Sequence, residues 1–175
     1  MPPIETERLR LHALRGTHRE ALTRLLGDPK VMRFSLSGPL DAPGVDAWME
    51  RHRRRAADPR FGFRAMMRRD GEEFVGICGL LPQRFDEGAG LEIAYRLLPD
   101  AWGEGLATEA ARACRSYAEN EFGTEPLFSF IEPANAPSIA VAERVGLRWM
   151  RSIVWWGRVV RIYATGESAL STPMH

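Results

Sequence analysis

Apolar residues recur along this chain with two different periods, and the period predicts which segments are strands and which are helices. Between residues 7 and 14, apolar and polar positions alternate with Leu9, Leu11 and Ala13 on one side, as is typical of a strand. Six further segments have a strand pattern: 61–68, 72–81, 90–98, 127–131, 147–156 and 158–165. Helical spacing of apolar residues predicts helices over 17–27, from about 41 or 44 to 57, over 104–121 and over 136–145.

The order of these elements predicts a single α/β (α+β) domain. The first half combines two helices with a hairpin at Asp70-Gly71, and the second half alternates strand and helix, which indicates a mixed sheet with helices on its faces. A length of 175 residues, with 45% apolar and 27% charged residues, suits one folded domain. We therefore expect residues 1–175 to form one domain, with the small and polar segment 166–175 as a flexible tail.

Charge and hydropathy exclude several classes of protein. The formal net charge of +1 gives no reason to expect a nucleic-acid partner, and no apolar run reaches the ~18 residues of a membrane span. The N-terminus lacks a basic-then-apolar signal pattern, so we expect a cytoplasmic protein. Cys78 and Cys114 both lie in apolar patterns, which favours two reduced thiols in the core over a disulfide or a metal site.

The most informative segment is the turn between the fourth strand and the longest helix, Trp102-Gly-Glu-Gly-Leu-Ala-Thr-Glu109. Two glycines allow the backbone to turn sharply and to approach a ligand closely. The first turn of a helix presents unpaired N–H groups and the positive end of the helix dipole, and this arrangement binds phosphate without a positive side chain. The segment is therefore a candidate phosphate site.

This segment matches other known glycine-rich phosphate-binding motifs less well. A nucleotide P-loop needs Lys and then Ser or Thr after its second glycine, where this chain has Leu106-Ala107. A dinucleotide fingerprint needs Gly or Ala at Thr108, and it belongs in a first strand–helix–strand unit. A plain strand-to-helix turn, with glycines for packing alone, remains the competing interpretation.

The residues Trp102–Ala110 resemble the acetyl-CoA motif of the GNAT superfamily of N-acetyltransferases, and within it the branch of RimJ/RimL-type ribosomal-protein-alanine acetyltransferases. Three other segments resemble that branch in the expected order. They are Glu5-Thr-Glu-Arg-Leu-Arg-Leu11, Leu91-Glu-Ile-Ala-Tyr95, and Asn135-Ala-Pro-Ser138 followed by Ala142-Glu-Arg-Val-Gly-Leu147. The departures are His12 in place of a frequent Arg, His18-Arg19 where an acidic residue is common, and Leu147 in place of Phe. These departures do not touch the cofactor segments, but they leave the acceptor open.

The resemblance implies a twisted, mostly antiparallel sheet of about seven strands, with a bulge in the fourth strand and a splay between the fourth and fifth. Acetyl-CoA, the co-substrate, would lie in that splay, and no metal is implied. Backbone groups of the fourth strand would bind the pantetheine arm and stabilise the developing oxyanion, while the glycine turn would bind the pyrophosphate. The residues implied in cofactor binding are Ile93, Ala94, Tyr95, Trp102, Gly103, Glu104, Gly105, Leu106, Ala107, Thr108, Asn135 and Ser138.

Direct transfer of acetyl to an amine asks for a base and an acid. Glu92 is the best candidate to take a proton from the ammonium, and an exposed or ion-paired strand residue is the competing interpretation. On chemistry alone His12, His18 and His52 are alternatives, although His52 lies on an apolar helix face. By resemblance Ser138 is a candidate acid for the leaving thiolate, with water as the alternative, and Tyr163 is expected to pack in the core.

The acceptor itself cannot be read from the sequence. By their position in the family, Phe34 and Trp48 are candidates for the acceptor pocket. The acceptor is a protein or peptide N-terminus or a small-molecule amine, and the Trp155-Trp156 pair is a candidate face for a homodimer. The alternative functions are a catalytically silent acyl-CoA-binding regulatory module and a plain scaffold domain.

Overall fold

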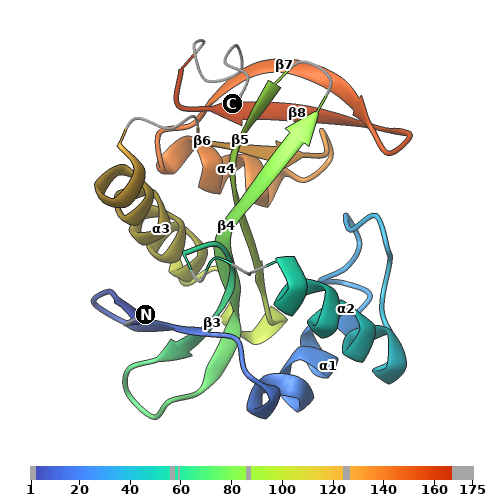
Figure 1. The fold of residues 1–175 in the computed structure, drawn as a ribbon, viewed down its shortest axis with the longest axis vertical. Helices are drawn as coiled ribbons and strands as arrows, with labels where there is room; N and C mark the ends of the chain where they lie inside the picture. Colours follow the sequence, from blue (N-terminus) through green and yellow to red (C-terminus); the bar gives the residue numbers. More distant parts are fainter. Residues whose placement is uncertain (1–2, 56–57, 59, 86–87, 124–126, 167–175) are drawn as a thin grey trace.

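One eight-stranded sheet organises the chain (Figure 1). The computed structural model describes residues 3–55, 58, 60–85, 88–123 and 127–166. The strands follow one another across the sheet in the order β1-β2-β3-β4-β5-β6-β8-β7, and every pairing among them is antiparallel except that of β5 with β6. The strands are β1 (Ile4–Glu5), β2 (Leu9–Ala13), β3 (Gly62–Arg68), β4 (Phe74–Phe85), β5 (Gly88–Leu97), β6 (Leu127–Ile131), β7 (Arg148–Trp155) and β8 (Arg158–Ala164).

Helices cover both faces of this sheet. They are α1 (Arg19–Gly27), α2 (Ala42–Arg55), α3 (Leu106–Phe122) and α4 (Ala136–Arg144), with short 3-10 turns η1 (Gly16–His18) and η2 (Pro99–Ala101). The buried residues of α3 and α4 belong to one apolar cluster, and those of α1 and α2 belong to another. Figure 1 shows α3 on one side of β3 and β4, with α1 and α2 on the other side.

The amphipathic pattern of each helix explains which face it covers. In α3 the inward residues are mostly small, so the helix axis can come close to the sheet: Leu106, Ala110, Ala111, Cys114 and Ala118. On the opposite face, α1 buries three leucines against Phe63, Ala65 and Ile77. Strand β5 contributes to both clusters, with Ile93 and Tyr95 toward α3 and Ala94 toward α1 and α2.

The sheet opens between β5 and β6. These two strands pair in parallel at only two positions, Leu91 with Leu127 and Glu92 with Phe128. Strand β5 then continues to Leu97 and β6 to Ile131 beyond the end of this ladder. The splay that we expected between the fourth and fifth predicted strands therefore lies at this junction.

The structure corrects four details of the prediction. The sheet has eight strands instead of about seven, because the two-residue strand β1 is too short to show alternation in the sequence. Strand β4 extends to Phe85, beyond the predicted end at residue 81. The expected bulge in the fourth strand is absent from its pairing with β4, since the register over Gly76–Phe85 and Gly88–Leu97 has no shift. The longest helix begins at Leu106 rather than at residue 104, because Glu104 and Gly105 still belong to the turn. Of the predicted flexible tail, residues 167–175 lie outside the described residues.

Both cysteines are buried in the core, as the sequence predicted. Cys78 on β4 and Cys114 on α3 are free thiols whose sulfur atoms lie 3.6 Å apart. The neighbouring Cys114 and the burial of the site raise the pKa of the Cys78 thiol well above its ordinary value, so Cys78 stays protonated. Tyr163 is buried as well, in agreement with its expected packing role. In the described part of the chain, none of the helices combines the length and apolarity needed to cross a bilayer.

Gly79 permits the close approach of β3 and β4 beside β5. A Cβ atom at this position would collide with the main-chain oxygen of Gly62 on the neighbouring strand. We therefore expect Gly79→Ala to lower the free energy of unfolding by about 3 kcal/mol, which urea denaturation measures. Gly16→Ala is the matched control, because a Cβ there has no atom within 4 Å and the substitution should cost little. Equal stability of the two variants would contradict the packing argument.

Candidate active site

A large cleft opens where β5 and β6 separate. Its volume is about 1530 Å³, and β5, β6, α3, α4 and the segments 6–8 and 30–35 supply its walls. Most of the residues proposed from the sequence line this cleft, and the exceptions are Trp48 and the three histidines considered as alternative bases. The lining includes Glu92, Ile93, Ala94, Tyr95, Trp102, Gly103, Glu104, Gly105, Leu106, Ala107, Thr108, Asn135, Ser138 and Phe34.

The glycine turn leaves the first turn of α3 open toward the cleft. Gly103 and Gly105 both have φ of +80°, a left-handed conformation that side chains with a Cβ rarely adopt. Gly105 is the N-cap of α3, and it provides no side chain to accept hydrogen bonds from the first turn. The N–H groups at the start of α3 are therefore available to an anion, in the geometry by which helix N-termini bind phosphate.

The N-terminal segment holds this turn in place. The Arg8 guanidinium forms an ion pair of 2.6 Å with Glu109 and donates a hydrogen bond of 2.9 Å to the carbonyl of Glu104. The Thr6 hydroxyl and the Arg8 main-chain N–H also donate to Glu109, at 2.6 and 2.8 Å. On the other side, Arg68 of β3 pairs with the Glu104 carboxylate at 2.7 Å. Residues about 100 positions apart in the sequence thus fix the backbone of the turn.

This network also removes an electrostatic conflict. A carboxylate in the first turn of α3 would repel a bound phosphate if it stood alone. Burial opposes the ionisation of Glu109, but the hydrogen bonds from Thr6 and Arg8 and the charge of Arg8 hold the pKa of this carboxyl below its usual value. Glu109 is thus ionised, and the positive charge of Arg8 compensates its negative charge. The roles of Thr6 and Arg8 were missed in the sequence, although both lie in the opening segment Glu5–Leu11 that carries part of the family resemblance.

Two hydrogen bonds brace the splay. The Tyr95 hydroxyl on β5 donates to the carbonyl of Ser138 on α4 at 2.9 Å, and the Ser129 hydroxyl on β6 donates to the carbonyl of Ile93 at 2.7 Å. The Ile93 carbonyl, one of the groups expected to contact a pantetheine arm, therefore already has a partner. Asn135 caps α4 by accepting a hydrogen bond of 3.3 Å from the Ser138 N–H.

Glu92 is the last residue of β5 that pairs with β6, and the cleft begins there. It is half-buried, and its carboxylate accepts a hydrogen bond of 2.7 Å from the Gln83 side chain. Burial raises the pKa of Glu92 above its usual value, although Gln83, the charge of Arg96 and a hydrogen bond from the Phe130 backbone oppose that effect. A carboxylate with a raised pKa in a cleft is a stronger proton acceptor than an exposed one.

The two candidates for the acceptor pocket, Phe34 and Trp48, lie in different places in the structure. Phe34 lines the cleft, with the Arg33 guanidinium 5.2 Å from the centre of its ring. Trp48 instead stacks on His52 at 5.4 Å and packs near Phe63, away from the cleft. The segment that carries Phe34 is tethered from the far end of the sheet, because Arg158 donates to the Ser35 carbonyl at 3.4 Å.

The histidines proposed as alternative bases are not among the residues that line the cleft. Burial lowers the pKa of His52, which packs against Trp48, and burial also lowers the pKa of His18. The His18 ring nitrogen accepts a hydrogen bond of 3.0 Å from the Arg15 N–H, so it caps the short turn η1 that precedes α1. Within the described residues, no three His, Cys, Asp or Glu side chains form a group suited to a metal ion.

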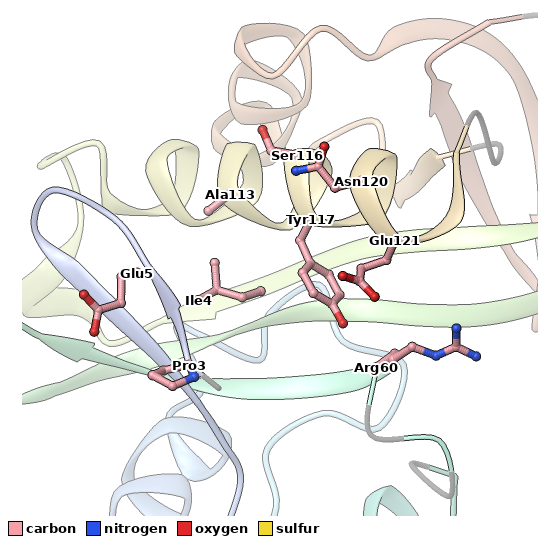
Figure 2. Close-up of a pocket in the computed structure, with 9 residues that line it drawn as sticks. All are labelled: Pro3, Ile4, Glu5, Arg60, Ala113, Ser116, Tyr117, Asn120 and Glu121. Carbon is pink, nitrogen blue, oxygen red and sulfur yellow. The ribbon is translucent and has the colours of Figure 1, made fainter. Parts of the chain in front are cut away.

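A second, smaller pocket lies along the flank of α3, next to β1 (Figure 2). Its volume is about 620 Å³, and Figure 2 shows Tyr117, Asn120 and Glu121 of α3 beside Ile4 and Arg60. It contains none of the residues proposed from the sequence, so the cleft at the splay is the candidate active site.

Comparison with known proteins agrees with this assignment. The sequence profile of the acetyltransferase (GNAT) domain matches residues 8–148. The protein YkkB of Bacillus subtilis is 33% identical over 163 residues, which cover 91% of this chain and 93% of YkkB. The FsC-acetyl coenzyme A-N(2)-transacetylase of Aspergillus fumigatus is 31% identical over 156 residues, which cover 83% of this chain and 65% of that protein.

The fold has close counterparts among solved structures. RimL, a ribosomal L7/L12 alpha-N-protein acetyltransferase solved in complex with coenzyme A, superposes with a TM-score of 0.78 at 17% identity, covering 95% of this chain and 99% of RimL. At that level of identity the likeness shows a shared fold. The profile match spans more than half of the chain, from Arg8 through the glycine turn and α4 to the first residue of β7. The chain therefore belongs to the GNAT family of acetyltransferases, whose members carry out acetyl-CoA-dependent N-acetylation.

Proposed function

We propose that this protein moves an acetyl group from acetyl-CoA to a primary amine by direct transfer, with both substrates bound in the cleft at the splay. The acceptor is a protein N-terminus or a small-molecule amine. The observation that supports this most strongly is the opening of the uncapped start of α3 into the same cleft as a half-buried carboxylate, Glu92. The start of α3 suits an anionic diphosphate, and the Glu92 carboxylate suits proton transfer.

The chain has the groups that coenzyme A binding requires. The open N–H groups of Leu106, Ala107 and Thr108 would hold the diphosphate, and the two glycines let it approach the backbone. Arg112 and Arg144 also line the cleft and add positive charge on this side. The Tyr95 hydroxyl ties α4 to β5 through the Ser138 carbonyl, and the pantetheine arm would lie along these two elements.

The reaction removes two protons from the ammonium form of the acceptor and delivers one proton to the sulfur, and the cleft supplies a group for the first removal and a group for the delivery. Bound acetyl-CoA supplies the acetyl group as an activated thioester. Glu92 takes a proton from the ammonium form of the acceptor, so that the nitrogen lone pair can form the new N–C bond. Ser138 donates a proton to the sulfur as the C–S bond breaks, and the second proton of the acceptor nitrogen, relayed through water, then returns to Ser138.

The cellular location and the oligomeric state stay predictions from the sequence. A cytoplasmic location and a homodimer through the Trp155-Trp156 face both belong to this proposal. Trp156 is 79% exposed, whereas Trp155 packs against Phe130 with their ring centres 5.0 Å apart.

Acetyl-CoA consumption distinguishes an enzyme from a silent binding module. We expect thiol release when acetyl-CoA is supplied together with members of a panel of small primary amines and N-terminal peptides, and no release without an amine. A thiol-reactive dye measures the rate, and mass spectrometry of the amine checks for a gain of one acetyl group. Coenzyme A binding without turnover of any amine would favour the regulatory module instead.

Gly105→Glu should weaken coenzyme A binding by about 100-fold, because a carboxylate at the start of α3 repels the diphosphate and distorts its amides. Isothermal titration calorimetry measures the dissociation constant. The matched control is Gly123→Glu at the other end of α3, where φ is also positive, at +74°, and a Cβ meets open space. Gly123 has a ψ of −139°, outside the left-handed region of Gly105, so the control carries at least as much backbone strain, and only the first variant should lose affinity. Unchanged affinity in Gly105→Glu would refute the diphosphate assignment.

Glu92→Gln should lower kcat by about 100-fold and leave the dissociation constant of acetyl-CoA nearly unchanged, because the amide keeps the shape of the side chain but accepts no proton. In the wild type, kcat/KM should rise with pH through the raised pKa of Glu92, since the carboxylate is the active form. A variant that retains full activity would exclude Glu92 as the base.

The same substitution has a consequence for stability. Because the folded-state pKa of Glu92 is raised, the folded protein binds this proton more tightly than the unfolded chain. The stability contributed by Glu92 is therefore present below the unfolded pKa and is lost as the pH rises through the folded pKa. We expect Glu92→Gln to unfold at a higher temperature than the wild type above that range, and at a similar temperature below it.

A further inference from the structure

The cleft has a second side, opposite the glycine turn, which the proposed diphosphate site does not include. The segment Lys30–Ser35 forms its outer rim. Its floor is the face of β5 that carries Glu92, Ala94 and Arg96, and Ala94 packs with the α1 and α2 cluster. We call this surface the acceptor side, because an amine must reach Glu92 across it.

Positive charge dominates the acceptor side. Among the described residues that line it, Lys30, Arg33 and Arg96 are cations, and Glu92 is the one carboxylate. The carboxylates near the glycine turn do not balance these cations. Glu104 pairs with Arg68 and Glu109 pairs with Arg8, so both are already compensated on the other side of the cleft.

Arg96 is the unusual member of this group. The side chain is half-buried, and its guanidinium lies 5.7 Å from the centre of the Phe63 ring. In the described part of the chain, it has neither a hydrogen bond nor an ion pair to a carboxylate. Burial lowers its pKa, with Glu92 as the one charge that opposes the effect. A buried charge without a partner is costly, and a ligand that supplies the partner would recover that free energy.

Arg96 does not form an ion pair with Glu92 in the described structure. The hydrogen-bond partner of Glu92 is Gln83, and the charge of Arg96, which acts on Glu92 without a hydrogen bond, does not outweigh the effect of burial on the pKa of Glu92. Glu92 and Arg96 lie four positions apart on the strand, a distance of roughly 13 Å between their Cα atoms. A proton acceptor and a cation without a hydrogen-bonded carboxylate thus lie on one face of β5.

We propose that Arg96, assisted at the rim by Lys30 and Arg33, binds an anionic group of the acceptor, so that the preferred substrate is a primary amine that also carries a carboxylate or a phosphate. This inference rests on the proposed function, because it assigns the acceptor of that same cleft. The amine lies at Glu92 and the anion at Arg96. Polyamines, whose several ammonium groups would face three cations, are poor substrates.

Matched amines that differ in one charge test the proposal. Triglycine is compared with triglycine amide, and 5-aminopentyl phosphate with 5-aminopentanol, so that the two arms distinguish a carboxylate from a phosphate. Spermidine is the cationic probe. We expect kcat/KM for the anionic member of at least one pair to exceed that for the neutral member by tenfold or more, mainly through a lower KM. Spermidine should react more slowly than either.

Three variants locate the source of this preference. Arg96→Gln should bring the anionic-to-neutral ratio close to one, and Arg96→Lys should restore part of it, because the charge returns without the fork of the guanidinium. Arg24→Gln removes an exposed arginine of α1 that is not among the residues lining the cleft, and its ratio should equal that of the wild type. A structural role for Arg96 would change the melting temperature but not the ratio.

A binding measurement separates this inference from the proposed function. With coenzyme A present, the anionic probes should raise the melting temperature of the wild type more than their neutral partners do, and Arg96→Gln should lose that difference. If no probe is acetylated but the difference in melting temperature persists, the anion site stands and the enzyme assignment falls. Equal shifts in the wild type, including none at all, an unchanged ratio in Arg96→Gln, or a preference for spermidine would overturn the inference.

Discussion

The early end of the ladder between β5 and β6 is the constraint on which the rest of this structure depends. A sheet that paired along its full length would have no gap in its middle, and the helices on its two faces would remain separate layers. Because the two strands pair at only two positions, the interior of the sheet is accessible from both sides. The start of α3 opens on one side of the gap, and the polar face of β5 opens on the other. A single cleft can therefore bring together a diphosphate and an amine that enter from different directions.

Long-range contacts give this opening its shape. Arg8 joins the N-terminal segment to the glycine turn through Glu104 and Glu109, so the shape of this turn is set by residues far from it in the chain. Tyr95 and Ser129 then hold the two walls of the splay at a fixed separation. Preformed walls reduce the ordering that a flexible ligand such as coenzyme A would otherwise impose on the protein.

The sequence predicted the fold well, and the residues that it proposes for cofactor binding line one cleft, whereas it named few of the residues on the acceptor side. Periodicity located seven of the eight strands and the four helices, because each spans enough residues to show a period, whereas β1 has two. The glycine turn was recognisable because a positive φ demands a particular residue type. Trp48 lies at the expected helical position, but its orientation depends on tertiary packing against His52 and Phe63, which no local pattern encodes. Arg96 was missed for the same reason, since a charged residue in a strand gives no local sign of being buried.

The hydrogen bond from Arg158 to the Ser35 carbonyl links β8 to the segment that forms the outer rim of the cleft. Arg158 also pairs with Glu132 at 2.8 Å, so it connects β8, the end of β6 and the segment that forms the outer rim of the cleft. The hairpin of β7 and β8 makes no part of the glycine turn. Substitutions in that hairpin can therefore reposition the rim while the coenzyme A half keeps its geometry. Divergence of amine choice among related proteins would then require few changes, and those changes would lie outside the segments by which the family is recognised.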